Sequence, residues 1–153
     1  MQQLYQQLIL EHSKKPHGRV VPGSLEAAAV KDRGSGLSHQ VNPTCGDEIT
    51  LRATVTDGVI TELIWEGQGC SISQASASVL IDLVTGEPVS QATEVNDLFH
   101  ELMRSRGQGL SDDAEEALGD ATAFTGVSQY PARIKCALLG WEALTGALAQ
   151  ATA

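Results

Sequence analysis

The chain has 153 residues, of which 42% are hydrophobic and 19% are charged, a composition typical of a folded protein. This length predicts a single domain with a core large enough to need no disulfides. Ten basic residues against 19 acidic residues give a net charge of −9. Because binding to nucleic acid depends on basic side chains that neutralise phosphates, this charge argues against nucleic acid as a partner.

The sequence predicts neither secretion nor a membrane partner. The segment from Met1 to Tyr5 lacks a basic stretch followed by an apolar run. No stretch approaches the roughly 18 apolar residues that a membrane span needs. We therefore expect a cytoplasmic protein. In that reducing compartment, three cysteines favour metal binding, thiol chemistry or burial over a disulfide framework.

Apolar residues at helical spacing predict an amphipathic helix over about the first dozen residues. Pro16 and Gly18 are expected to end this helix. Residues 14–38 are rich in glycine and proline and are predicted to be mostly loop. The beginning of the chain is therefore expected to hold one helix and a long connection.

A change to period-two alternation from Asp47 predicts a half-buried strand. Asp57-Gly58 is typical of a tight hairpin turn, and residues 59–65 supply the returning strand. A short edge strand is expected over residues 39–42. The predicted sheet is therefore small, antiparallel and three-stranded.

Helices dominate the second half of the predicted fold. Apolar spacing after Gly69 predicts a helix closed by Gly86 and Pro88, and a further helix follows around residues 95–103. Ser111 is a candidate N-cap for a short helix, and Pro131 opens the last helix. The expected architecture is α+β, with the helices packed on one face of the sheet.

Three cysteines, Cys45, Cys70 and Cys136, and the acid Asp47 are the candidates for chemistry. Cys45 and Asp47 lie two positions apart in a segment of turn-forming residues, so a sulfur and a carboxylate oxygen there can share one cation. Cys70 lies at a predicted helix start, where the dipole stabilises a thiolate. We expect the fold to gather all four side chains around one metal, because three sulfurs and one oxygen suit Zn²⁺ or Fe²⁺.

Burial in the core is the alternative for these cysteines. They are far apart in the sequence and form no C-x-x-C pair of the kind seen in zinc fingers. Free cysteine is also among the most buried residue types. Cys45 and Cys70, however, lie in glycine-rich turns, where a core cysteine has little reason to be, and this context favours the metal.

Residues 42–47, 67–73 and 133–137 resemble the three cysteine motifs of the IscU/NifU-like iron–sulfur cluster assembly family. The motifs occur in order, with an acid two residues after the first cysteine, and the likeness covers nearly the whole chain. It implies one IscU/SufU-like domain over residues 1–153. The fold it implies is SufE/NifU-like, with a small antiparallel three-stranded sheet and helices on one face.

Within this family the chain is more similar to the SufU branch. Classical scaffolds carry a histidine immediately before the third cysteine, and here that position is Lys135. The segment between the second and third cysteines also resembles the extended segment of SufU, with the insertion placed at residues 87–125. The missing histidine argues against cluster scaffolding.

Similarity to SufU implies a zinc-dependent sulfurtransferase. Such a protein activates a pyridoxal-phosphate cysteine desulfurase of the SufS type and accepts its persulfide sulfur for iron–sulfur cluster assembly. By the family pattern the zinc ligands are Cys45, Asp47, Cys70 and Cys136. Cys45 is the implied catalytic thiol: a desulfurase histidine replaces it on zinc, and it then attacks the persulfide. Other iron–sulfur assembly proteins are further expected partners.

Two other functions stay open at this stage. One is an iron–sulfur cluster assembly scaffold that binds iron as Fe²⁺ or a transient [2Fe–2S] cluster, because cluster sites use thiolates first. The other is an adaptor domain that zinc merely stabilises.

Arg133 and the histidines complete the polar candidates. Arg133 precedes Cys136 by three residues and is expected to lie beside the thiolates without binding the metal. Four histidines lack metal-ligand spacing to any cysteine and are predicted to be structural or on the surface. They are His12, His17, His39 and His100.

Overall fold

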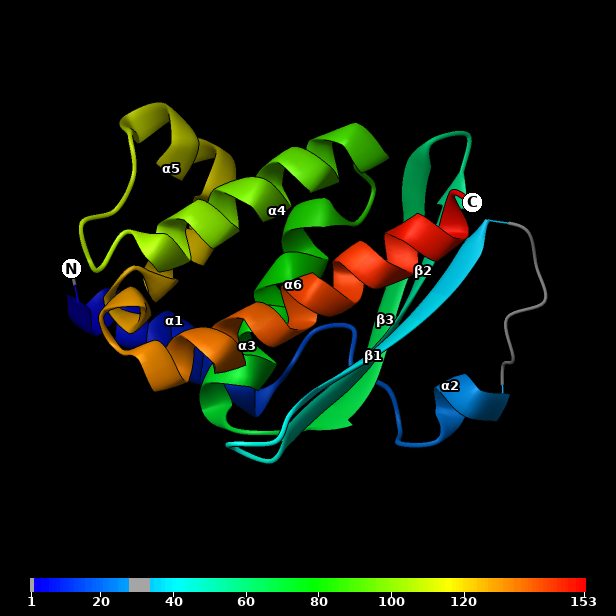
Figure 1. Ribbon diagram of the computed structural model, residues 1–153, viewed down its shortest axis with the longest axis horizontal. Coiled ribbons are helices and arrows are strands. Elements are labelled where there is room, and N and C mark those ends of the chain that lie inside the picture. Colours follow the sequence, from blue (N-terminus) through cyan, green and yellow to red (C-terminus); the bar gives the residue numbers. More distant parts are fainter. Residues whose placement is uncertain (1, 28–33) are drawn as a thin grey trace.

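The computed structural model describes residues 2–27 and 34–153, and in it helices lie against a three-stranded antiparallel sheet (Figure 1). The strands are β1 (Ser35–Asn42), β2 (Asp47–Thr56) and β3 (Val59–Gln68). The helices are α1 (Gln2–Lys14), α2 (Ser24–Ala27), α3 (Ser71–Val84), α4 (Val89–Arg104), α5 (Asp112–Leu118) and α6 (Pro131–Ala151). Two short 3-10 helices, η1 (Gly119–Phe124) and η2 (Gly126–Gln129), precede α6. The predicted α+β fold is confirmed.

The predicted hairpin forms the centre of the sheet, whose strand order is β1-β2-β3. Asp57 and Gly58 have φ angles of 52° and 78°, the left-handed pair that a two-residue hairpin turn requires. Along β2, alternate side chains are buried toward the helices, including Ile49, Leu51 and Ala53. The alternation that predicted this strand therefore reflects one buried face and one partly exposed face.

β1 begins earlier than predicted, at Ser35 instead of His39, and α2 also lies within the predicted loop. One of the glycines that favoured a loop, Gly36, has a packing role here. A Cβ atom at Gly36 would clash with the backbone carbonyl of Ala147 in α6. The Gln150 side chain accepts a hydrogen bond of 2.6 Å from the Leu37 N–H. Close approach of α6 thus explains a glycine inside a strand.

Residues 87–125, the predicted insertion, form α4, α5 and η1 and contribute to the core. The Phe99 ring of α4 stacks on Trp141 of α6, with centroids 4.4 Å apart. The Asn96 side chain donates to the Trp141 carbonyl at 3.1 Å. The predicted cap at Ser111 is confirmed, since its side chain accepts from the Ala114 N–H.

The segment after α1 runs along the outer edge of β3. Val20 N–H donates to the Trp65 carbonyl at 2.8 Å, and Trp65 N–H donates to the Gly18 carbonyl at 2.9 Å. The indole Nε1 of Trp65 also donates to the His17 carbonyl, at 2.9 Å. These bonds fix the chain between α1 and α2 against the sheet. Of the helices described, none combines the length and the apolar character that crossing a membrane demands.

Candidate metal centre

The turn between β1 and β2 carries the first cysteine. Asn42 and Asp47 pair across the end of the two strands, and the Cys45 N–H donates to the Asn42 carbonyl at 3.3 Å. Gly46 has a φ of 71°, which lets the chain reverse at this point. Cys45 is exposed, whereas Asn42 and Asp47 on either side are buried. The turn therefore presents one accessible thiol above a buried acid.

Asp47 is fully buried and receives no cationic partner from the described residues. Its Oδ1 accepts a hydrogen bond of 2.8 Å from the Cys70 N–H, and its Oδ2 lies 3.9 Å from Cys70 Sγ. Within the described ranges, no Lys, Arg or His nitrogen forms a salt bridge with this carboxylate. A Cβ atom at Gly69 would clash with the Ser73 hydroxyl and press on Asp47. The residue before Cys70 must therefore lack a side chain.

Cys136 reaches the same place from the second turn of α6 and is 2% exposed. Asn42 Nδ2 donates to its sulfur at 3.6 Å, so the strand end also orients this thiol. One ligand atom from each of Cys45, Asp47 and Cys136 lies within 4.8 Å of the others. The turn between β1 and β2, the first residue of β2 and α6 thus place three of the four predicted ligands together.

Cys70 joins this group through Asp47. It is exposed and is the N-cap residue of α3, and its backbone and sulfur both approach the carboxylate. We call Cys45, Asp47, Cys70 and Cys136 the cysteine centre. The sequence predicted that these residues converge, and the structure brings all four to the same end of the sheet.

The charges in the cysteine centre favour a bound cation. The pKa of the Cys136 thiol is strongly raised, first by burial, then by its hydrogen bonds with Asp47 and Cys45 and by the proximity of Cys70. Burial and the neighbouring acidic groups thus disfavour the negative charge of the Cys136 thiolate, and a divalent ion would compensate that charge. Three sulfurs and one oxygen match the donors and the coordination number of Zn²⁺. The residues present therefore fit such an ion.

Arg133 and Lys135 are both exposed near the start of α6. The Arg133 guanidinium lies 5.7 Å from the centre of the Tyr130 ring, which holds it over an aromatic face. Its expected place beside the thiolates stays a prediction. His39, the histidine nearest to Cys45 in the sequence, instead lies 2.6 Å from the Thr50 hydroxyl through its Nδ1.

A second group of possible metal ligands, His12, His17 and Asp82, was missed from the sequence. One ligand atom from each lies within 4.8 Å of the others. The two histidines are near each other in the sequence, but Asp82 follows much later on α3, and no local pattern connects them. Only the packing of α1 against α3 brings them together.

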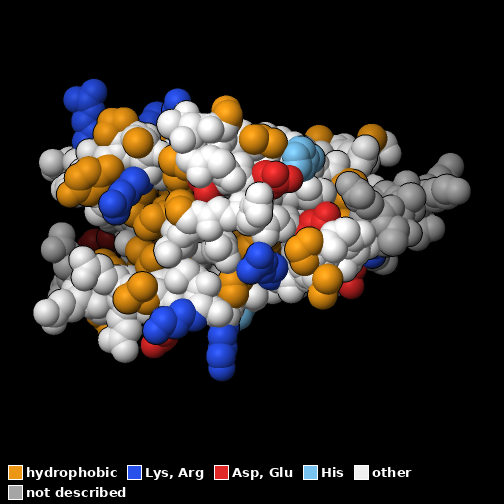
Figure 2. Space-filling view, turned by 90° about the horizontal axis from the view of Figure 1, so that it is seen from below, with side chains coloured by type: hydrophobic (Ala, Val, Ile, Leu, Met, Phe, Trp, Pro, Cys, Tyr) orange, Lys and Arg blue, Asp and Glu red, His pale blue; other side chains and the backbone are white. Residues whose placement is uncertain are grey.

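Exposed hydrophobic side chains lie on the side of the molecule that carries the β1–β2 turn. Figure 2 shows the molecule from below, which is the side that carries the β1–β2 turn in Figure 1. In this view hydrophobic side chains gather mainly over the left half, where α1 and the first turns of α6 lie. Val41, next to the turn, is 52% exposed, and Tyr130, at the start of α6, is 55% exposed. This end offers apolar contacts beside the accessible thiol.

Comparison with known proteins identifies relatives over nearly the whole chain. Residues 4–149 match the model of the NifU-like N terminal domain. The zinc-dependent sulfurtransferase SufU of Bacillus subtilis is 38% identical over 96% of this chain and 90% of its own length. The iron–sulfur cluster assembly scaffold protein IscU of Thermotoga maritima is also 38% identical, over 95% of this chain and 92% of its own length.

A solved structure shares the same fold. The putative iron–sulfur cluster assembly scaffold protein for the SUF system from Fervidobacterium islandicum AW-1 superposes with a TM-score of 0.71. It is 31% identical, and the match covers 95% of this chain and 97% of that one. With its three cysteine segments in order and converging in space, the chain belongs to the family of NifU-like N-terminal domains, which includes IscU and SufU.

Proposed function

We propose that this protein is a zinc-dependent sulfurtransferase that accepts persulfide sulfur from a cysteine desulfurase for iron–sulfur cluster assembly. The observation that supports it best is the exposed Cys45 thiol above the buried Asp47 and Cys136. Lys135, where classical scaffolds carry a histidine, favours this function over cluster scaffolding. The similarity to the sulfurtransferase SufU gives further support.

In this proposal Cys45, Asp47, Cys70 and Cys136 hold the zinc ion. Bound zinc would keep the thiolates deprotonated at neutral pH. Asp47 fixes the Cys70 turn through the 2.8 Å bond to its N–H, and Asn42 orients Cys136 through its side-chain amide. Cys45 differs from Cys136 because it lies in an exposed turn, where a partner can reach its sulfur.

The transfer step is a thiol–disulfide exchange at Cys45. The Cys45 thiolate attacks the outer sulfur of the desulfurase persulfide, and a new sulfur–sulfur bond forms on Cys45. The sulfur–sulfur bond of the desulfurase breaks, and its electron pair leaves with the desulfurase cysteine as a thiolate. The outer sulfur moves to Cys45 with its proton, so the step needs no external oxidant or reductant.

The partner in this proposal is a cytoplasmic cysteine desulfurase of the SufS type. Val41 and Tyr130 are large side chains left more than half exposed next to the cysteine centre. Apolar and aromatic side chains of this kind anchor protein interfaces. The net charge of −9 favours a partner surface with basic residues around these contacts.

The substitution Cys45→Ala tests the proposal. It should abolish stimulation of desulfurase turnover and the appearance of labelled sulfur on this protein, measured with ³⁵S-cysteine. Thr44→Ala, an exposed neighbour in the same turn, is the matched control and should retain both activities. Undiminished stimulation by the Cys45→Ala protein would refute Cys45 as the acceptor.

A scaffold for a [2Fe–2S] cluster is the second candidate, because the IscU scaffold protein of Thermotoga maritima is as identical to the chain as SufU of Bacillus subtilis is. Three thiolates and a carboxylate could also hold iron. Anaerobic reconstitution followed by visible absorption separates the two functions. A stable cluster that moves to an apo-acceptor would favour the scaffold, whereas a zinc-only protein with labelled Cys45 would favour sulfur transfer.

A further inference from the structure

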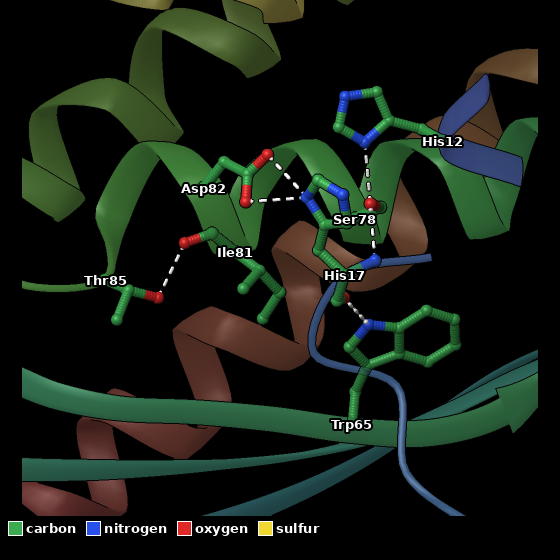
Figure 3. A network of polar contacts seen from close by, with 7 residues as sticks. All are labelled: His12, His17, Trp65, Ser78, Ile81, Asp82 and Thr85. Carbon is green, nitrogen blue, oxygen red and sulfur yellow. Dashed lines mark hydrogen bonds and ion pairs between the residues drawn. The ribbon is translucent and has the colours of Figure 1, made fainter. Parts of the chain in front are cut away.

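His12, His17 and Asp82, which we call the histidine cluster, meet where α1 ends against α3 (Figure 3). His12 lies in α1, His17 lies in the segment that follows it, and Asp82 lies on α3. One imidazole nitrogen from each histidine and one carboxylate oxygen lie within 4.8 Å of one another. These donors are separate from the cysteine centre and have no part in the proposed sulfur transfer.

Buried groups hold both histidines in place. The fully buried hydroxyl of Ser78 lies 2.7 Å from His12 Nδ1, and it accepts a bond of 2.7 Å from the backbone N–H of His17. The two imidazole rings are 4.9 Å apart between centroids. Trp65 fixes the His17 carbonyl from the other side, as Figure 3 shows. These contacts therefore hold the two rings near each other and near Asp82 before any ligand arrives.

The spacing of His17 and Asp82 suits two donors on one ion. His17 Nδ1 lies 2.7 Å from one carboxylate oxygen of Asp82 and 2.9 Å from the other. Tetrahedral donors that bind one ion at about 2.1 Å lie about 3.4 Å apart. A cation between His17 and Asp82 therefore requires this pair to open by about 0.5–0.7 Å. A shift of His12 by about 1 Å would complete the set.

The surroundings leave room for further ligands. A hollow of about 410 Å³ is lined by Glu11, His12, Lys14, Lys15 and His17. The Glu11 carboxylate offsets one of the two lysine charges, and the lysine side chains, both exposed, are long enough to turn toward solvent. The overall charge of −9 also attracts cations to the surface. Water or a small ligand can complete the coordination from the hollow.

We propose that the histidine cluster is a second metal site, which binds a divalent first-row transition ion through two imidazoles and one carboxylate. Two histidines and a carboxylate with open positions suit Fe²⁺, Co²⁺, Ni²⁺ or Zn²⁺, and the absence of sulfur donors distinguishes this site from the cysteine centre. The ion is exchangeable, because His17 and Asp82 are 52% and 47% exposed in their side chains.

The test uses the full chain with one equivalent of Zn²⁺ on its cysteine centre, titrated with Co²⁺. Wild type should bind Co²⁺ without sulfur-to-cobalt charge-transfer absorption, since the site contains no thiolate. The paramagnetic ion should broaden the ring NMR signals of His12 and His17 and leave those of His39 and His100 sharp. Asp82→Asn should weaken Co²⁺ binding at least about tenfold. Asp97→Asn, an exposed acid on α4, is the control and should leave it unchanged.

Three results would overturn the second site. They are the absence of Co²⁺ binding after the zinc is loaded, equal binding by the Asp82→Asn protein, and charge-transfer absorption that shows Co²⁺ entering the cysteine centre. His17→Asn provides an independent variant, and circular dichroism checks that both proteins fold. Any of the three results would mean that His17 and Asp82 bind no metal and only hold the segment after α1 against α3. The sulfur-transfer proposal is unaffected, because it is tested separately through Cys45→Ala.

Discussion

The cysteine centre and the histidine cluster differ in how their charges are compensated. Asp47 is fully buried beside three thiols, with no salt bridge to it among the described residues. Asp82, in contrast, is about half exposed and already paired with His17. Burying an uncompensated charge is costly, whereas an exposed pair is solvated by water. Metal should therefore stabilise the fold strongly at the cysteine centre and weakly at the histidine cluster.

Removal of the metal tests this difference most directly. Zinc at about 1,000 times its Kd stabilises a folded protein by about 4 kcal/mol, so a strong chelator should lower the free energy of unfolding by about this amount. Urea unfolding with and without chelator measures the change. Asp82→Asn should lose as much stability as wild type on chelation, because the cysteine centre carries the effect. Equal stability with and without chelator would contradict the comparison.

Asp47→Asn should act in opposite directions in the two metal states. The amide oxygen can still accept from the Cys70 N–H, but the buried negative charge is gone. In the metal-free protein we expect the free energy of unfolding to rise by about 1–3 kcal/mol. Zinc affinity, measured by competition with a chromophoric chelator, should fall at least about tenfold. A loss of stability in the metal-free protein would show that the carboxylate is compensated in another way.

Ser78→Ala should weaken the folded state through the histidine cluster. The substitution leaves His12 Nδ1 and the His17 N–H without their buried partner, and the expected loss is about 1–2 kcal/mol. Urea denaturation measures the loss, and Ser90→Ala, an exposed serine of α4, is the matched control. No difference between the two variants would mean that water replaces the hydroxyl.

Asp82→Asn should have the smallest effect on stability. An exposed ion pair contributes less than about 1 kcal/mol, so the free energy of unfolding should hardly change. The same substitution is expected to reduce Co²⁺ affinity, which separates a ligand from a structural partner. A large loss of stability without a change in Co²⁺ binding would identify Asp82 as a purely structural residue.

Local patterns in the sequence predicted the elements that depend on local chemistry. The alternation along β2, the Asp57-Gly58 turn and the Ser111 cap each encode their conformation within a few residues. The convergence of the cysteines was also predicted, because the family motifs carry it across the chain. In these cases a short segment, or a motif already known, contains the necessary information.

Long-range packing explains what the sequence did not reveal. Gly36 indicated a loop, yet it lies in β1. The residue there is glycine because α6 leaves no space for a side chain. His12 and His17 show no relation to Asp82 in the sequence, since only the packing of α1 on α3 brings them within reach. Such contacts depend on the whole fold, and no local pattern of residue types specifies them.

The pairing of residues 18–20 with β3 also bears on the solubility of this protein. A strand at the border of a sheet offers unsatisfied amides and carbonyls on which another molecule can add a strand. Here the Gly18 carbonyl and the Val20 N–H already occupy the backbone groups of Trp65. Releasing this segment would uncover a template for intermolecular β-sheet growth, so the connection after α1 protects the chain against aggregation.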